Sequence, residues 1–271
     1  MTYETILYSV ADQIATITLN RPAKMNAFTA RMGAEVGDAM LRADEDRAAR
    51  VIIITGAGDR AFCAGADIGG FARDIKAREG EKVEGEFSGG RSRQAAALPI
   101  LMRNLSKPTI AAINGYALGV GLTMILPCDV RIASENARMG VIFPRVGLIT
   151  ELGSTYLLPR LVGVSRAAEM MLTGRQYTAN EALQMGLVSR VTPAGKVMDG
   201  ARELAGEMLQ CSATSLTFTK RALYQGLEGN IETAMQFEGF AADKCYVSPE
   251  HKEYVTAFME KRKPDFSKFT K

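Results

Sequence analysis

Two glycine-rich turns hold the residues of this chain whose types and spacing could do chemistry. The first is Phe62-Cys63-Ala64-Gly65-Ala66-Asp67, and the second is Gly115-Tyr116-Ala117-Leu118-Gly119-Val120-Gly121. Gly119 and Gly121 stand where a helix is expected to begin, so the N–H groups there lack partners inside the helix and carry the positive end of its dipole. Paired donors of this kind could hold the negative charge that develops on a carbonyl oxygen, and losing one typically lowers a rate about 10²–10³-fold.

Other kinds of site are disfavoured by the residues around the turns. The second turn reads G-x-x-x-G-x-G rather than the dinucleotide-binding G-x-G-x-x-G, and no Walker lysine follows it. The chain has no G-x-S-x-G motif, and its one histidine, His251, lies in a charged stretch and is interpreted as a surface residue. A Ser–His or Cys–His nucleophile is therefore not expected. Without further histidines or C-x-x-C spacing, no metal site is predicted either.

The elements that must position the turns alternate between strand and helix. An α/β architecture with parallel neighbours follows from that alternation. Thr178 and Glu181 fit a capping box at a helix start. We expect strands over residues 6–10, 14–19, 51–55, 109–113, 129–133 and 186–188, and helices after residue 29 and over 93–105 and 119–126.

The predicted secondary structure changes near residue 196, from alternating strands and helices to helices alone. We predict an α/β core over 1–196 and a helical tail over 197–271. A tail of about 75 residues buries little surface by itself, so it must pack on the core or on another subunit. Residues 73–94 are charged and contain glycine, and are interpreted as a surface loop, with a lid beside the first turn as the alternative.

Composition indicates which partners and which cellular location to expect. The formal net charge of +3 gives no reason to expect nucleic acid or an anionic membrane surface as a partner. No run approaches the roughly 20 apolar residues of a transmembrane helix, and no signal-peptide pattern opens the chain. Four scattered cysteines favour reduced, mostly buried thiols, so a cytoplasmic location is expected.

Both turns resemble those of the crotonase superfamily, the enoyl-CoA hydratases and isomerases. The similarity spans nearly the whole chain in order. It rests on Ala61-Phe62-Cys63-Ala64-Gly65-Ala66-Asp67-Ile68, on Asn114-Gly115-Tyr116-Ala117-Leu118-Gly119-Val120-Gly121, on Pro127-Cys128-Asp129-Val130-Arg131-Ile132-Ala133, on Leu157-Leu158-Pro159-Arg160-Leu161-Val162-Gly163, on residues 182–188, and on Ala257-Phe258-Met259-Glu260-Lys261-Arg262-Lys263.

The resemblance implies a crotonase-like spiral of ββα units with a C-terminal helical trimerisation tail, and a homotrimer or dimer of trimers. It implies acyl-CoA thioester substrates, with coenzyme A arriving as part of the substrate and no separate cofactor. It places the two oxyanion-binding N–H groups on Ala66 and Val120. It also suggests contacts with coenzyme A from Lys24, Ala64, Asp67, Ile68, Phe258 and Lys261, the last two from across a subunit boundary.

The chain departs from the hydratase pattern at two positions. Hydratases of this family carry glutamates where this chain has Thr123 and Arg145. Adding water to a double bond needs a base and an acid, and neither residue serves well as one. A single carboxylate remains nearby, Glu151, at a turn where related isomerases carry a catalytic Asp or Glu. Its alternative role is a carboxylate that stabilises a helix N-terminus. Asp129 is interpreted as structural.

Three hypotheses follow. In the first, the chain is an isomerase-like enzyme in which Glu151 shuttles a proton while the oxyanion hole stabilises a dienolate. In the second, Glu151 activates water alone and the chain is a true hydratase. In the third, the chain is a non-catalytic acyl-CoA-binding or assembly protein that has kept the fold and lost its acids.

Overall fold

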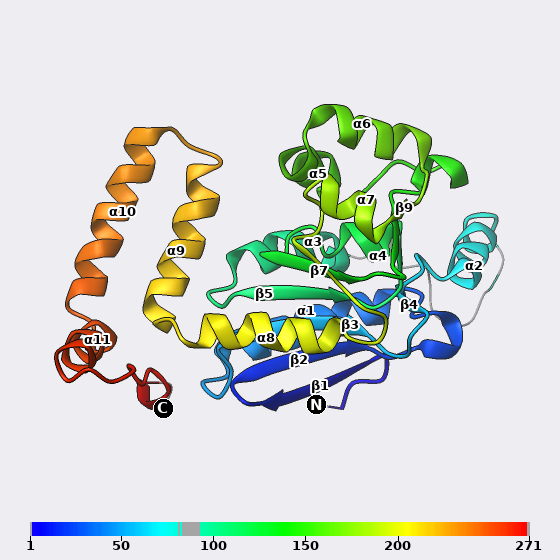
Figure 1. Cartoon of the computed structure of the whole chain (residues 1–271). Helices are drawn as coiled ribbons and strands as arrows, with labels where there is room; N and C mark the ends of the chain where they lie inside the picture. Colours follow the sequence, from blue (N-terminus) through cyan, green and yellow to red (C-terminus); the bar gives the residue numbers. More distant parts are fainter. Residues whose placement is uncertain (1, 81, 83–92, 270–271) are drawn as a thin grey trace.

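The computed structural model describes residues 2–80, 82 and 93–269. In this part of the chain the strands form two sheets (Figure 1). The larger sheet has the order β1 (Ile6–Ala11), β2 (Ile14–Leu19), β3 (Val51–Gly56), β5 (Thr109–Ile113), β7 (Val130–Ser134) and β10 (Arg190–Thr192). The smaller sheet has the order β4 (Ala61–Cys63), β6 (Tyr116–Leu118), β8 (Arg138–Gly140) and β9 (Tyr177–Thr178).

The chain winds through the two sheets as a spiral. Each pass adds one strand to the larger sheet and the next strand to the smaller one, in the pairs β3–β4, β5–β6 and β7–β8. Apart from the antiparallel pairs β1–β2 and β8–β9, the paired strands run parallel. The predicted α/β spiral of ββα units is confirmed, as are the hairpin at its start and the parallel neighbours.

Helices cover the spiral. They are α1 (Ala30–Glu45), α2 (Ile68–Arg78), α3 (Arg93–Asn104), α4 (Val120–Thr123), α5 (Ser154–Val162), α6 (Val164–Thr173), α7 (Ala179–Gln184) and α8 (Val197–Leu209), with 3₁₀ turns η1 (Pro22–Lys24) and η2 (Phe143–Val146). A third 3₁₀ turn, η3 (Ser267–Phe269), lies after the last helix of the tail. The expected caps are present: Thr29 Oγ1 accepts from Met32 N at α1, and Thr178 and Glu181 form a capping box at α7. None of the described helices is long and apolar enough to cross a membrane.

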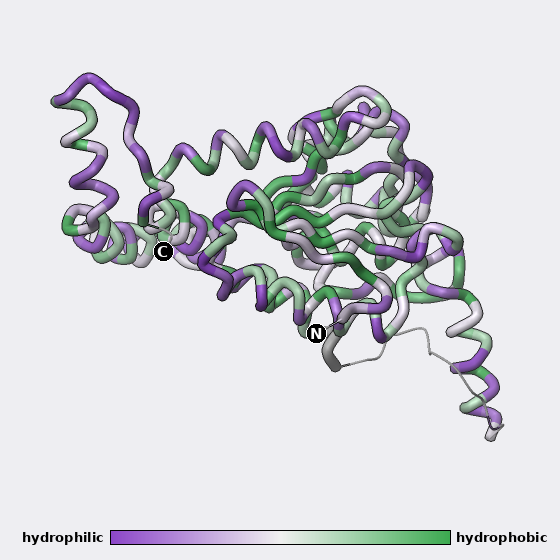
Figure 2. The backbone as a smooth tube through the Cα atoms, turned by 90° about the horizontal axis from the view of Figure 1, so that it is seen from below, coloured by the Kyte–Doolittle hydropathy of each residue, from purple (hydrophilic) through white to green (hydrophobic). Residues whose placement is uncertain are grey.

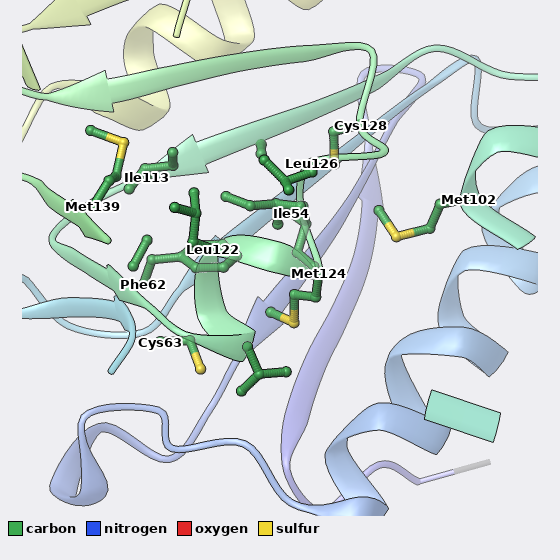
Figure 3. Close-up of a cluster of buried hydrophobic side chains, with 14 of the residues drawn as sticks. Ile54, Phe62, Cys63, Met102, Ile113, Leu122, Met124, Leu126, Cys128 and Met139 are labelled. Carbon is green, nitrogen blue, oxygen red and sulfur yellow. The ribbon is translucent and has the colours of Figure 1, made fainter. Parts of the chain in front are cut away.

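Two apolar layers flank the larger sheet. One contains the buried face of α1 and the residues around α4, including Phe62, Leu122 and Met139 (Figure 3). The other lies under α8, where Val197, Ala201 and Ala205 pack on strand residues such as Ile53 and Ile110. In Figure 2 the strands form the hydrophobic centre of the molecule. Since β3 is buried along its whole length, its continuous apolar run follows from cover on both faces.

Three sequence-based expectations about elements were wrong. The helix expected over 119–126 ends at Thr123, because tight turns lead from Met124 to Pro127. The strand expected over 186–188 is absent, since Leu187 N and Val188 N donate to Ala182 O and close α7, and β10 begins at Arg190. The segment 73–94 is helical as far as Arg78, with mostly exposed side chains, and 81 and 83–92 lie outside the described residues.

The last helices, α9 (Ala213–Gly226), α10 (Ile231–Tyr246) and α11 (Pro249–Met259), stand apart from the spiral (Figure 1). Asp129 ties α9 to the core: its carboxylate accepts from Lys220 Nζ at 2.8 Å, from Tyr224 Oη at 2.7 Å and from Thr109 N at 2.6 Å. The structural role expected for Asp129 is therefore confirmed. Within the tail, the buried Glu250 carboxylate accepts from Ala213 N at the start of α9.

Candidate active site

The two glycine-rich turns lie next to each other because they follow neighbouring parallel strands. Strands β4 and β6 are parallel, with Cys63 opposite Ala117. The two segments that follow these strands therefore leave the smaller sheet at the same end. A Cβ at Gly121 would overlap the Cys63 carbonyl oxygen and lie 2.8 Å from Cys63 Cβ. This close approach explains why a glycine is needed at position 121.

The first turn is held open in a way that leaves one N–H group unused. Phe28 bridges the turn: its N–H donates to Gly65 O at 2.8 Å, and its carbonyl accepts from Asp67 N at 2.9 Å. Between these two bonds lies the N–H of Ala66, which has no partner among the described residues. Gly65 has a φ of +113°, a conformation that glycine adopts without strain.

The second turn leaves an equivalent donor. Gly119, at a φ of +53°, donates its own N–H to Gly140 O at 2.9 Å, and its carbonyl accepts from Leu122 N and Thr123 N. The N–H of Val120, the first residue of α4, has no partner in the described part of the chain. Adjacent turns thus present two unpaired backbone donors, the residues predicted from the resemblance to bind an oxyanion.

Glu151 follows β8, the third parallel strand of the smaller sheet. β8 lies beside β6, and a Cβ at Gly119 would lie 3.5 Å from Ile142 Cγ1, just after β8. The chain then passes through η2 to the turn that holds Glu151. Leu152 and Gly153 both have positive φ, of 56° and 66°, and Ser154 N donates to Glu151 O at 3.2 Å. The backbone is therefore tightly turned directly after Glu151.

The environment of Glu151 suits proton transfer. Burial raises the pKa of its carboxyl above the ordinary value, and its side chain makes no hydrogen bond or ion pair with the described residues. The first turn of α5 holds no acidic residue, because the helix begins only at Ser154. The alternative role of Glu151 as a first-turn carboxylate thus has little support. A carboxyl with a raised pKa and no hydrogen-bond partner can both take and return a proton.

The two residues that replace the hydratase glutamates differ in surroundings. Thr123 closes α4 and is fully buried. Arg145 is exposed, and its Nε donates to Thr173 O at 3.0 Å at the end of α6, with its stem against Gly174. A cation at a helix C-terminus is favourable, so Arg145 has a structural role in this chain.

Four of the residues suggested for coenzyme A gather at the first turn. Lys24 ends η1, and the next residue, Met25, accepts from Ala64 N at 3.1 Å. Asp67 forms an ion pair with Arg21 at 2.8 Å, and Ile68 at the start of α2 is 79% exposed. Although burial raises the pKa of Asp67, the hydrogen bond and charge of Arg21 lower it overall. Asp67 is therefore an anion committed to Arg21.

Phe258 and Lys261 lie elsewhere in the chain. Phe258, in α11, is 70% exposed, and Lys261 follows that helix with a φ of 56°. In Figure 1 α11 stands at the opposite end of the molecule from α2. The structure of one chain does not bring these two residues to the first turn, and their predicted role requires a second subunit.

The cysteines have no nucleophilic role at the site. Burial raises the pKa of Cys63 and of Cys128 to about 12, so both stay protonated near neutral pH. Cys63 is thus a small apolar filler of the core. The expectation of mostly buried thiols holds for these two alone, because Cys211 is exposed and Cys245 intermediate. His251 is partly buried against Tyr246 and belongs to α11.

Sequence reasoning missed two asparagines that brace the turns. Asn26 is fully buried at a φ of 54°, and its Nδ2 donates to Ala57 O at 3.0 Å and Ala61 O at 2.8 Å. Asn114 Nδ2 donates to Gly56 O at 2.9 Å and Gly58 O at 2.7 Å. Both side chains satisfy carbonyls at the end of β3, at the start of β4 or in the loop between them. The sequence feature that could have identified them is a short amide side chain near a residue that interrupts regular structure. Asn26 follows Arg21-Pro22, and Asn114 directly precedes Gly115.

Comparison with known proteins agrees with this geometry. The family described as "Enoyl-CoA hydratase/isomerase" matches residues 9–269. The chain is 35% identical to a crotonyl-CoA hydratase of Syntrophomonas wolfei over 98% of this chain and 99% of that protein, and 33% identical to a short-chain-enoyl-CoA hydratase of Clostridium acetobutylicum over 97% of each. A crystal structure of enoyl-CoA hydratase from Bacillus anthracis matches with a TM-score of 0.85 and 34% identity, over 97% of this chain and 99% of that one.

The parallel spiral, with its two adjacent turns that present unpaired backbone donors, agrees with these matches. The chain belongs to the enoyl-CoA hydratase/isomerase family, and it is an acyl-CoA enzyme of that type.

Proposed function

We propose that this enzyme moves a proton along an enoyl thioester, with Glu151 as its one acid–base group and the N–H groups of Ala66 and Val120 as the oxyanion hole. Glu151 removes a proton from the carbon next to the thioester of a 3-enoyl-CoA. The two N–H groups stabilise the dienolate oxygen, and Glu151 returns the proton two carbons along the chain. The product is the conjugated 2-enoyl-CoA.

One observation carries the proposal. Glu151 is a partly buried carboxyl with a raised pKa and no described hydrogen-bond or ion-pair partner, and it follows β8, the strand beside the second donor turn. A shuttle needs one group that is basic when the substrate arrives and acidic once the dienolate has formed. A carboxyl with a raised pKa meets both requirements, and isomerisation needs no second carboxylate.

The coenzyme is proposed to lie along the first turn. Lys24 and the exposed Ile68 flank that turn, and the backbone of Ala64 and Asp67 forms its sides. Phe258 and Lys261 would complete the binding site from a neighbouring subunit. The exposed apolar side chains of α10 and α11, including Ile231, Met235 and Met259, support self-association through the tail as a trimer or dimer of trimers.

Hydration is the second candidate, and the relatives favour it, because those in Syntrophomonas and Clostridium are named as hydratases. In that reaction Glu151 would take a proton from water and then supply it to the substrate. Thr123 cannot replace a carboxylate as the second group, since a hydroxyl does not titrate near neutral pH. The geometry therefore favours isomerisation over hydration.

A panel of 2-enoyl- and 3-enoyl-CoA thioesters of different chain lengths, incubated in ¹⁸O-labelled water and followed by mass spectrometry, tests the reaction type. Isomerisation predicts conversion of the 3-enoyl thioester with no gain of label. Labelled 3-hydroxyacyl product from the 2-enoyl thioester would instead show hydration. Tight calorimetric binding of the thioesters with no turnover of any of them would show the non-catalytic binding protein.

A further inference from the structure

One face of α9 contacts the core along its length, and its last contact reaches the helix that follows Glu151. Lys220, Tyr224 and Glu228 are spaced four residues apart, so they lie on one side of α9 and of the turn that ends it. Lys220 and Tyr224 both donate to Asp129. Glu228 contacts side chains of α3 and α5. The tail therefore touches both the larger sheet and the helix next to the proposed proton shuttle.

The Glu228 carboxylate joins α9 to two helices of the core. Arg103 Nη1, in the last turn of α3, lies 2.7 Å from Glu228 Oε1, and Tyr156 Oη, in the first turn of α5, donates to the same oxygen at 3.1 Å. The Arg103 guanidinium lies 4.6 Å from the ring centroid of Tyr224 and 5.8 Å from that of Tyr156. Tyr156 is thus in contact with the tail through its hydroxyl and with α3 through its ring.

Hydrogen bonds connect Tyr156 to the turn that holds Glu151. Tyr156 N donates to Gly153 O at 3.0 Å, and Ser154 N donates to Glu151 O at 3.2 Å. The hydroxyls of Thr150 and Ser154 hydrogen-bond to each other on either side of the carboxylate-bearing residue. Since these bonds join the turn and the start of α5 into one unit, a shift of Tyr156 also shifts the backbone of Glu151.

We propose that Tyr156 is a positioning residue, whose hydrogen bond to Glu228 fixes α5 against the tail and thereby places the Glu151 carboxyl for proton transfer. The Glu151 side chain makes no hydrogen bond or ion pair with the described residues, so its place depends on the backbone that carries it. Full activity then requires that α9 is held on the core. The inference rests on the proposed function, since it takes Glu151 as the group that moves the proton.

Turnover of a 3-enoyl-CoA by Tyr156→Phe protein from pH 5 to pH 9 tests this role. The variant keeps the ring beside Arg103 and loses the hydroxyl that reaches Glu228. We expect kcat to fall by up to about tenfold, the effect of one hydrogen bond, with little change in KM. Burial raises the pKa of Glu151, so a carboxyl that moves towards solvent should have a lower pKa. The acid limb of the kcat profile should therefore move to lower pH.

Tyr224→Phe is the matched control, because it removes a hydroxyl that joins α9 to Asp129 instead of to α5. It should lower the Tm more than Tyr156→Phe does, since it leaves a buried acceptor with one donor fewer, and it should keep the wild-type kcat and acid limb. A wild-type acid limb in Tyr156→Phe, or an equal shift of the limb in Tyr224→Phe, overturns the inference.

Variants of Glu228 test the same contact from the tail. Glu228→Gln keeps an oxygen that can accept from Tyr156 and should retain most of the activity, whereas Glu228→Ala should be as slow as Tyr156→Phe. Combining Glu228→Ala with Tyr156→Phe should cause no further loss, because both remove one hydrogen bond. Losses that add in the double variant contradict the inference. Wild-type turnover in Glu151→Gln would instead contradict the proposed function.

Discussion

Glu151 has opposite consequences for stability and activity, because burial disfavours its charged form. The folded state holds the proton more tightly than the unfolded chain, so charging the carboxyl costs stability as the pH rises past its ordinary value. Below that value both states are protonated and the cost vanishes. A group that weakens the fold near neutral pH and has no described partner is typical of a functional site.

Glu151→Gln should therefore raise the Tm near neutral pH and have little effect near pH 4, since glutamine is never charged. Thermal unfolding of the wild type and the variant across this pH range is the measurement. Glu79→Gln, at the exposed end of α2, serves as the control and should shift the Tm by little at either pH. A variant less stable than the wild type at pH 7 would mean that the carboxylate has a stabilising partner.

At the scale of elements, the site depends on how closely the two turns approach. The carbonyl of Cys63 and the backbone of Gly121 leave no room for a side chain between β4 and α4. Gly37, in the middle of α1, has nothing within 4 Å of a built Cβ. The same substitution should therefore act in opposite directions at the two positions.

Gly121→Ala should force the turns apart, lower stability by about 1–3 kcal/mol through overpacking, and sharply reduce turnover. Gly37→Ala should leave turnover unchanged and stabilise α1 by up to about 1 kcal/mol. Denaturant unfolding and thioester turnover of both variants test this pair. Full activity in Gly121→Ala would separate the donor turns from catalysis.

The elements also show which structural features could be predicted from the sequence alone. The hairpin, the buried strands and the Thr29 and Thr178 caps were predictable because each rests on local chemistry. Leu187 and Val188 were wrongly predicted to form a strand, because their apolar character reflects burial in the core after α7 rather than a place in a sheet. The unpaired N–H groups could be suspected from glycine spacing and family resemblance. The hydrogen bonds of Phe28 and Gly140 that shape the two turns, and the bracing by Asn26, depend on contacts between distant segments.

At the scale of the whole molecule, one buried ion pair fixes the tail on the core. Lys220 is 7% exposed and donates both to Asp129 and to Lys107 O, so α9 is held at the start of β7. Lys220→Met leaves the Asp129 carboxylate buried without its cation, which costs about 3–5 kcal/mol. Denaturant unfolding should show this loss. The exposed pair Lys196–Asp199 provides the control, because Lys196→Met should change stability by less than about 1 kcal/mol.

The exposed apolar side chains of the tail predict self-association. Met235 in α10 is 63% exposed, so Met235→Glu should weaken an interface between subunits at little cost to the fold of one chain. Light scattering should show an assembly larger than the 29.3 kDa chain and a smaller species for the variant. Leu41→Glu, at a 47% exposed position on α1, should leave the assembly intact. A monomeric wild type would contradict this expectation.

The proposed isomerisation requires Glu151 as the one group that moves the proton. The decisive measurement is turnover of a 3-enoyl-CoA in ¹⁸O-labelled water by the wild type and by Glu151→Gln, followed by mass spectrometry from pH 5 to pH 9. The wild type should form unlabelled 2-enoyl-CoA and lose activity as the pH falls through the raised pKa of Glu151. The variant should be slower by about 10²–10⁴-fold, the usual contribution of general acid–base catalysis. Wild-type turnover in Glu151→Gln, or labelled oxygen in the product, would contradict the account.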